Sequence, residues 1–270
     1  MLRRIVTTAL LVGFYLIWPG RASAGEIVPL SVTETQPHDA RSYTQGLFFI
    51  GDYLYESSGL YGRSAFSRRR FPAGAVDASY SLPEEWFAEG SALAEGEIYL
   101  LTWKENTAVV LDPESLAVKR FLGYEGEGWG LTFDGERLWR SDGSNKLYPH
   151  KPGDFSPDGP PVRVFFGRRS VGGLNELEWD PVHKVILANV YGLDYVAVID
   201  PSEGCVLHWL DGRPLRVLAE KAGLETDAQT LNTVLNGLAL APDGRSLWLT
   251  GKLWPEMYQV EWPPSELTSK

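Results

Sequence analysis

A carboxylate, several amides, a lysine and large aromatic residues recur beside short apolar runs of this sequence. The members of this set are Gln45, Glu89, Trp103, Trp129, Asn175, Tyr191 and Lys252. The mixture is unusual for ordinary turns, which are built mainly from Gly, Asp, Asn and Ser. A mostly apolar pocket with a few convergent polar groups is the common form of a small-ligand site. The residue types therefore predict that a small molecule binds here.

Several of these residues also have a purely structural explanation. Glu89 precedes a glycine and could be a solvated turn acid, and Lys252 follows Thr250-Gly251, where a turn lysine is ordinarily exposed. The aromatic residues could be spacers between packed sheets. Asn236 has the character of a cap at the entry of a strand, and Asp142-Gly143-Ser144 that of a plain β-turn. Residue types alone leave both explanations open.

The elements that would bring these residues together are five copies of one module. Short apolar runs are broken by Gly, Asp, Asn and Pro, which is all-β patterning, and no long helical period is present. The modules open at Thr44, Ala88, Gly128, Leu174 and Leu235, at separations of 44, 40, 46 and 61 residues. An average of about 49 residues fits a propeller blade of four strands. The sequence therefore predicts an all-β fold, a five-bladed β-propeller, over residues 25–270.

Rotation about the axis of a propeller places equivalent residues in rings. The opening residues Gln45, Glu89, Trp129, Asn175 and Asn236 form one ring, and a second contains Glu56, Trp103, Asp142, Tyr191 and Lys252. The last module has no fourth strand of its own. We expect Ile27 to Thr35 to pair with Tyr258 to Trp262 and close the last blade, which removes an open edge. A β-sandwich is the alternative, but it would not explain five similar openings.

The first 24 residues have the order of a signal peptide. Arg3 and Arg4 precede an apolar run from Ile5 to Trp18, and Ala22-Ser23-Ala24 supplies small residues for cleavage after Ala24. A membrane anchor is the alternative, but the run is shorter than a spanning helix requires. We therefore expect a secreted or periplasmic protein without stable membrane insertion.

Charge and the remaining reactive residues restrict the function further. The net charge of the whole chain is −10, and the region after residue 24 is more acidic still, because the first 24 residues hold three arginines and no acid. This field repels nucleic acid. One cysteine, Cys205, permits no internal disulfide, and four histidines at no metal-ligand spacing (His38, His150, His183 and His208) give no support for zinc. We expect a monomer.

Several motifs, in order, resemble those of the plant-type glutaminyl cyclases, a family also found in bacteria. They are Pro37-His38-Asp39, Tyr43-Thr44-Gln45-Gly46-Leu47, the run from Glu56 to Ser64, Leu101 to Asn106, Asn175 to Glu178, Val234 to Gly237 and Thr250 to Pro255. The resemblance covers about residues 37 to 255. It implies a five-bladed propeller, in agreement with the module count.

The resemblance implies glutaminyl-peptide cyclotransferase activity, in which an N-terminal glutamine becomes pyroglutamate and ammonia leaves. It places the proton-shuttling acid at Glu89, within Phe87-Ala88-Glu89-Gly90. Gln45, Asn175 and Lys252 match substrate-binding positions, and Trp103 and Trp129 match aromatic walls. The family often has Trp where this chain has Tyr191. The implied partners are peptides or proteins that begin with glutamine, and no metal or organic cofactor is required.

Two other functions are compatible with a propeller. One is a lactonase-like hydrolase, with a hard cation held by oxygen ligands of Glu89, Asn175 and Asn236. That class usually has six blades, whereas this sequence shows five modules. The other is a binding propeller without catalysis, for which a proton-shuttling acid has no purpose.

Overall fold

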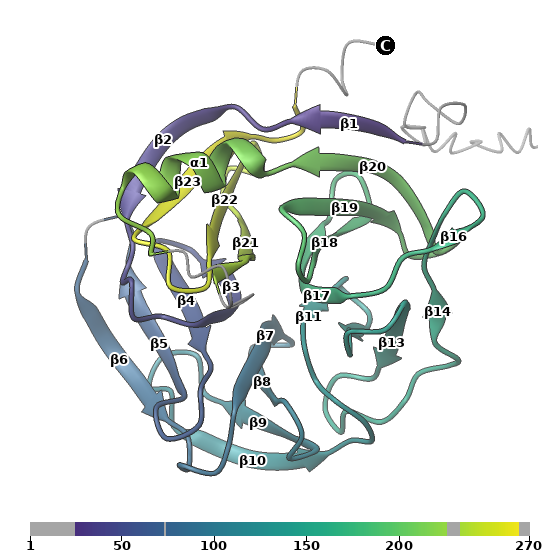
Figure 1. Cartoon of the computed structure of the whole chain (residues 1–270). Coiled ribbons are helices and arrows are strands. Elements are labelled where there is room, and N and C mark those ends of the chain that lie inside the picture. Colours follow the sequence, from purple (N-terminus) through teal and green to yellow (C-terminus); the bar gives the residue numbers. More distant parts are fainter. Residues whose placement is uncertain (1–24, 73, 226–232, 265–270) are drawn as a thin grey trace, which may run out of the picture.

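The computed structural model describes residues 25–72, 74–225 and 233–264, and these form five sheets arranged around one axis (Figure 1). The predicted five-bladed β-propeller is therefore confirmed. The expected signal peptide, residues 1–24, lies outside the described residues. Within the described part, no helix is long and apolar enough to cross a membrane.

Each blade is built on four antiparallel strands, with the first strand nearest the axis. Blade 1 contains β3 (Thr44–Ile50), β4 (Tyr53–Ser58), β5 (Ala65–Arg70) and β6 (Val76–Ser81). Blade 2 contains β7 (Ala88–Ala94), β8 (Glu97–Thr102), β9 (Thr107–Leu111) and β10 (Val118–Gly123). Blade 3 contains β11 (Leu131–Phe133), β12 (Leu138–Arg140), β13 (Lys146–His150) and β14 (Val162–Arg163).

The fourth and fifth blades carry the additions to the repeat. Blade 4 contains β17 (Leu174–Asp180), β18 (Val185–Val190), β19 (Tyr195–Asp200) and β20 (Cys205–Asp211), and the short β15 (Phe165–Phe166) and β16 (Arg169–Ser170) extend its sheet. Blade 5 contains β21 (Leu235–Leu240), β22 (Ser246–Gly251), β23 (Glu256–Glu261) and β2 (Val32–Pro37).

The N-terminal strand closes the ring, but not as one continuous strand. β2 pairs antiparallel with β23, as predicted for the fourth strand of the last blade. The expected single strand from Ile27 to Thr35 is wrong at its beginning, because β1 (Glu26–Pro29) pairs in parallel with β20 of blade 4. Val28 and Leu30 are buried between blades 4 and 5. The N-terminal segment therefore joins these two blades before β2 adds the fourth strand of blade 5.

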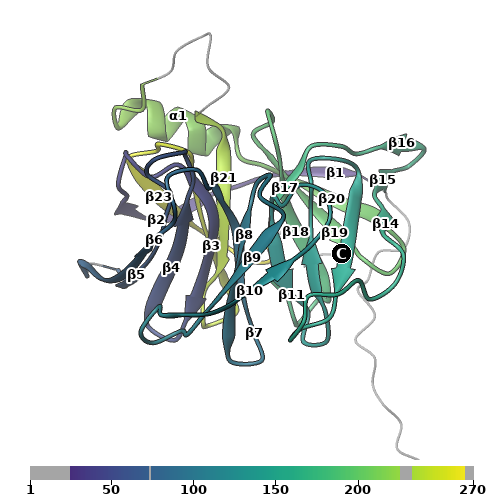
Figure 2. The same ribbon diagram turned by 90° about the horizontal axis from the view of Figure 1, so that it is seen from below.

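One helix was not predicted, and it explains the longest module. α1 (Arg213–Lys221) lies between β20 and β21, where the openings are 61 residues apart. Only Leu215 and Ala219 are fully buried along its nine residues, which is too short a pattern to stand out as a helical period. Because strands alternate in direction, the links between blades all lie at one end of the disc. Figure 2 shows α1 at that end.

Candidate active site

The first strands of four blades are irregular at the point where they open. The register with the second strand shifts between Thr44 and Gly46, Ala88 and Ser91, Leu174 and Leu177, and Leu235 and Leu238. Such a β-bulge interrupts the alternation of side chains and turns one of them in a new direction. The residues inside these shifts include Gln45, Glu89, Asn175 and Asn236. The repeated bulge is therefore the local device that positions the opening residues.

Glycines beside the opening residues allow neighbouring blades to approach closely. A Cβ atom on Gly130 would lie 2.0 Å from the carbonyl oxygen of Asn175, and one on Gly90 would lie 2.6 Å from the backbone of Gly130. The Gly90 N–H donates to the carbonyl of Trp129 at 2.6 Å. Only glycine fits these two positions. Because glycine has no side chain, blades 2, 3 and 4 can lie this close to one another near the axis.

Hydrogen bonds between blades hold the backbone of the opening residues. The Ser57 hydroxyl donates to the carbonyl of Glu89 at 2.6 Å. The Ser141 hydroxyl donates to the carbonyl of Asn175, also at 2.6 Å. In both pairs the serine belongs to the preceding blade. The two opening residues are thus fixed by their neighbours, which is the rigidity that a preorganised site requires.

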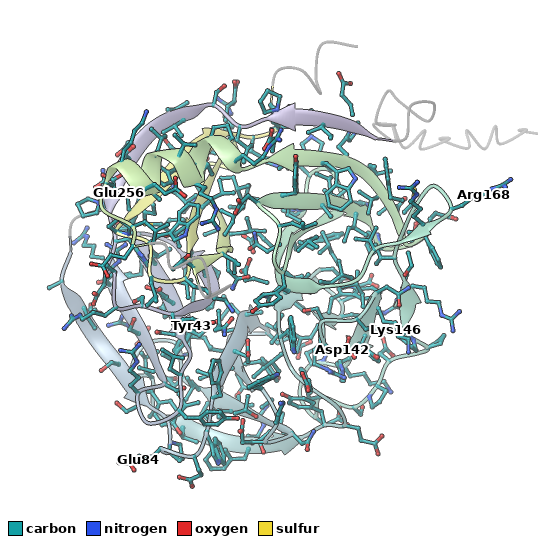
Figure 3. All side chains as sticks on the ribbon, in the orientation of Figure 1. Tyr43, Glu84, Asp142, Lys146, Arg168 and Glu256 are labelled. Carbon is teal, nitrogen blue, oxygen red and sulfur yellow. The ribbon has the colours of Figure 1, made fainter. Side chains whose placement is uncertain are left out.

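A cavity of about 280 Å³ lies where the blades converge. It is lined by all seven residues predicted from the sequence, together with two more: Tyr43, Gln45, Phe87, Glu89, Trp103, Trp129, Asn175, Tyr191 and Lys252. These residues come from all five blades or from the loops beside them. Figure 3 shows the labelled Tyr43 near the middle of the disc, whereas Glu84, Arg168 and Glu256 lie towards the rim.

Glu89 is the buried carboxyl group of this cavity, with 5% of its surface exposed. Burial raises its pKa well above the ordinary value; the charge of Lys252 opposes this shift, and the charges of Glu127 and Glu105 add to it. A solvated turn acid would be exposed, so that explanation of Glu89 is wrong.

Lys252 is also buried, at 4% exposed, although its place after Thr250-Gly251 suggested an exposed turn. Burial lowers its pKa to about 8, against the opposing effect of Glu89. Its Nζ atom lies 4.6 Å from the ring centroid of Tyr43 and 5.5 Å from that of Tyr191. The two rings hold the ammonium group in an environment where it can bind an anionic centre.

Two amides supply further polar groups to the cavity. Asn175 is buried, and within the described part of the chain its Oδ1 atom has no hydrogen-bond partner. A buried amide without a partner requires one from a ligand or from water. The Oε1 atom of Gln45 accepts from Nδ2 of Asn236 at 3.5 Å, which leaves the Gln45 amide nitrogen for other partners.

Aromatic rings form the walls of the cavity. Trp129 contacts Tyr191 edge to face, with ring centroids 5.7 Å apart. Trp103 makes a similar contact with Phe87, at 5.5 Å. These rings line the cavity, so the explanation of Trp103, Trp129 and Tyr191 as spacers alone is wrong.

Three members of the predicted rings do not line the cavity. Asn236 donates to the carbonyl of Thr44 at 2.8 Å and so links blade 5 to blade 1. Asp142 accepts from the backbone N–H of Ser144 at 3.0 Å, as expected of a plain turn. Glu56 forms an ion pair with His38 at 3.0 Å.

Among the described residues that line the cavity, Glu89 is the one carboxylate, and none is a histidine or cysteine. Among the residues that the structure describes, no group of three or more His, Cys, Asp or Glu side chains is arranged to hold a metal. The cation site considered from sequence needed Glu89, Asn175 and Asn236 together. Asn236 does not line the cavity; its Nδ2 atom donates to Thr44 of the neighbouring blade, and its Oδ1 atom has no hydrogen-bond partner among the described residues.

Sequence reasoning did not assign a role to two residues of the cavity, Tyr43 and Phe87. Each immediately precedes the first strand of its blade, β3 or β7, and belongs to a motif that was noticed for its polar residue. Burial raises the pKa of Tyr43 to about 12, and the nearby Tyr191 and Glu89 add to this effect. Their position two residues before an opening residue, Gln45 or Glu89, was the signal available for finding them.

Comparisons with solved structures identify proteins of similar fold. A solved glutaminyl cyclase from Myxococcus xanthus is 32% identical, with a TM-score of 0.77 over 87% of this chain and 97% of that one. A calcium-binding regucalcin from Agrobacterium tumefaciens matches 87% of this chain and 95% of its own, with a TM-score of 0.51 and 11% identity, which is a likeness of fold alone.

The amino-acid sequence is similar to proteins of the same family. A glutaminyl-peptide cyclotransferase from Arabidopsis thaliana is 34% identical over 235 residues, which are 86% of this chain and 71% of the relative. The family model for glutamine cyclotransferase matches residues 8–262. The chain therefore belongs to the glutamine cyclotransferase family.

Proposed function

We propose that this enzyme converts the N-terminal glutamine of peptides and proteins to pyroglutamate. The α-amine nitrogen bonds to the side-chain carbonyl carbon, the bond from that carbon to the amide nitrogen breaks, and ammonia leaves. The observation that carries the proposal is a single buried carboxyl group, Glu89, in one aromatic cavity with Lys252, Gln45 and Asn175.

Glu89 is the proton shuttle in this proposal. The attacking α-amine must lose a proton, and the departing amide nitrogen must gain one. One carboxylate within reach of both nitrogens can take the first proton and return it to the second. A raised pKa suits this task, because it brings the group closer to the pH at which it must both accept and donate.

The polar groups around Glu89 stabilise the oxygen of the tetrahedral intermediate. When the amine attacks, the side-chain carbonyl oxygen gains negative charge and needs donors that are already in place. The Lys252 ammonium and the amides of Gln45 and Asn175 line the same cavity and supply such donors. Their burial increases the effect, because few water molecules compete.

The aromatic walls reduce the entropy cost of cyclisation. Attack occurs within one residue, so the substrate must fold back until the amine lies against its own side-chain carbonyl. A cavity of about 280 Å³ between Trp103 and Trp129 suits a single compact glutamine. Holding that conformer before reaction is a large part of what an enzyme can contribute to an intramolecular step.

The decisive experiment is an assay of the purified protein on a glutamine-initiated peptide in the presence of EDTA. We expect ammonia release, a mass decrease equal to one ammonia, and a product blocked at its N-terminus. Turnover only after a divalent metal is added would favour the hydrolase alternative. No turnover of this peptide, with tight binding of it, would favour a binding propeller.

Export and oligomeric state belong to the same proposal. We place the mature protein outside the cytoplasm, as a secreted or periplasmic monomer that begins at Gly25, on the strength of the sequence order in residues 1–24. N-terminal sequencing of protein recovered from the periplasm or medium tests the cleavage, and light scattering tests the monomer. Recovery of the intact N-terminus from the membrane would contradict export.

A further inference from the structure

We infer that Glu127 is a positioning residue for the proposed reaction: its carboxylate holds both tryptophan walls of the cavity in place. This inference rests on the proposed function. Glu127 lies on the link between β10 and β11 and does not line the cavity itself. Glu127 lies outside the family motifs given above.

The geometry joins the two walls through one atom. The indole N–H of Trp103 donates to Oε2 of Glu127 at 2.8 Å, and the indole N–H of Trp129 donates to the same oxygen at 2.9 Å. Trp103 belongs to blade 2 and Trp129 to the opening of blade 3. A single carboxylate oxygen therefore fixes the orientation of both rings relative to each other. Such charge-assisted hydrogen bonds are stronger than neutral ones.

The backbone of Glu127 is itself held by a buried cation. Arg140 donates to the carbonyl oxygen of Glu127 and, at 3.1 Å, to that of Glu125. Its guanidinium lies between the rings of Tyr124 and Tyr148, with its central carbon 4.9 Å and 4.6 Å from their centroids. This arrangement holds the loop rigid, so the carboxylate that it carries has a defined position.

The Arg140 side chain is fixed at its other end by a neutral histidine. Its Nε–H donates to Nε2 of His150 at 3.2 Å, and the other ring nitrogen of His150 lies 2.8 Å from the carbonyl of Phe155. Burial lowers the pKa of His150 to about 4, so Nε2 can accept while Nδ1 keeps its proton. A continuous set of contacts therefore leads from blade 3 to the walls of the cavity.

Glu127 also acts on the proposed proton shuttle through its charge. Burial is the main cause of the raised pKa of Glu89, and the charge of Glu127 raises it further. The other groups that interact electrostatically with Glu89 are Lys252, Glu105, Tyr43, Tyr61 and Tyr124. Removal of the Glu127 charge should therefore let Glu89 ionise at lower pH. A residue that merely stabilised its loop would not produce this effect.

Two substitutions separate the two roles of Glu127. Glu127→Gln removes the charge but keeps a side-chain oxygen that can accept from both indoles, whereas Glu127→Ala removes both. Glu125→Ala is the matched control, because Glu125 lies on the same loop, is exposed and contributes only its backbone carbonyl to Arg140. Steady-state kinetics on a glutamine-initiated tripeptide from pH 5 to 10 and the Tm of each variant are measured beside the wild type.

We expect Glu127→Ala to raise KM about 10-fold, since two indole N–H groups lose their partner. Glu127→Gln should keep KM within about threefold of the wild type and move the acidic limb of the kcat/KM profile to lower pH. Glu125→Ala should match the wild type in both. If Glu127→Ala does not fold, Glu127→Leu replaces it, since that variant keeps a side chain of similar size but removes the acceptor oxygens, and a raised KM is again expected.

Two results would overturn the inference while the proposed function stands. One is an active wild type with Glu127→Ala equal to Glu125→Ala in KM and pH profile. The other is a Glu127→Gln variant that loses as much affinity as Glu127→Ala, because an acceptor oxygen alone should maintain the walls. An inactive wild type would instead refute the proposed function, and the inference with it.

Discussion

Glu89 and Lys252 are buried in the same cavity and act on each other's ionisation. Burial raises the pKa of Glu89 and lowers that of Lys252, and each charge partly offsets the shift of the other. Relative to an exposed acid and an exposed lysine, the pKa of Glu89 is therefore shifted upwards and that of Lys252 downwards, to about 8. Groups whose environments shift their pKa values in this way are characteristic of acid–base catalysts.

Replacement of Glu89 by Gln should remove most of the activity and leave the fold intact. Glutamine has nearly the same volume, but it cannot accept and return a proton. A general acid–base group contributes on the order of 10²–10⁴-fold in rate, so kcat should fall by that factor. The measurement is kcat on a glutamine-initiated peptide, with the Tm recorded for the same preparation.

Glu85→Gln is the control for that substitution. Glu85 lies four residues earlier and is exposed, so its replacement should change kcat and Tm little. A Glu89→Gln enzyme that keeps wild-type kcat would show that another group moves the proton. Glu56 would then be the first candidate to test, although its ion pair with His38 already occupies it.

Lys252→Met should lower kcat/KM about 10²- to 10³-fold, the usual effect of removing one preorganised donor. The wild-type rate should also decline as pH rises through about 8, where Lys252 loses its charge. Because that charge lowers the pKa of Glu89, the variant's acidic limb should move to higher pH. The pH profile of Lys252→Met, beside that of the exposed Lys221→Met, tests both effects.

An unchanged acidic limb in Lys252→Met would show that the two groups do not interact. An unchanged kcat/KM would show that the ammonium does not contact the developing oxyanion. The second result would leave Gln45 and Asn175 as the donors of the site.

The candidate site could be predicted well where repeats and family motifs overlap, and poorly where contacts are long-range. Glu89, Trp129 and Asn175 occupy equivalent places in successive modules, so rotation about the axis brought them together. Burial of Lys252 could not be predicted, because Thr250-Gly251-Lys252 has the composition of an exposed turn. Glu127 was missed because one of its two partners, Trp103 of blade 2, lies 24 residues away, so the sequence does not show that its carboxylate joins two rings.

The fold was predictable in blade number but not in its additions. Five similar openings fixed the count, since each opening begins a first strand that must lie near the axis. The parallel pairing of β1 with β20 could not be predicted, because Ile27 to Thr35 reads as one extended segment. The N-terminus divides this segment between two blades: Leu30 packs into the core after β1, and pairing with β23 begins at Val32.

The stability of the protein should fall as pH rises from about 4 to 8, in part because of Glu178. Glu178 is half-buried, and the partial loss of water around it raises its pKa to about 8, although its Oε1 atom accepts the backbone N–H of Leu240 at 2.7 Å. The folded state therefore keeps a proton that the unfolded state releases above about pH 4.3, and each rise in pH up to 8 favours unfolding.

Glu178→Gln removes this titration and should reduce the stability difference between pH 5 and pH 8.5. Urea unfolding at both pH values measures it. The control is Glu220→Gln, on the exposed face of α1, which should unfold with the wild-type pH dependence. An equal pH dependence in all three proteins would mean that Glu178 is ionised in the folded state.

Leu30→Ala should destabilise the protein much more than Ile27→Ala, three residues earlier. Leu30 is 4% exposed and packs into the core between blades 4 and 5, whereas Ile27 is 53% exposed. Truncation of a buried leucine costs about 2–5 kcal/mol, but an exposed substitution usually stays within about 0.5 kcal/mol. The free energies of unfolding of the two variants, measured in urea, test whether the N-terminal segment joins blades 4 and 5. Equal values would show that β1 lies on the surface without joining them.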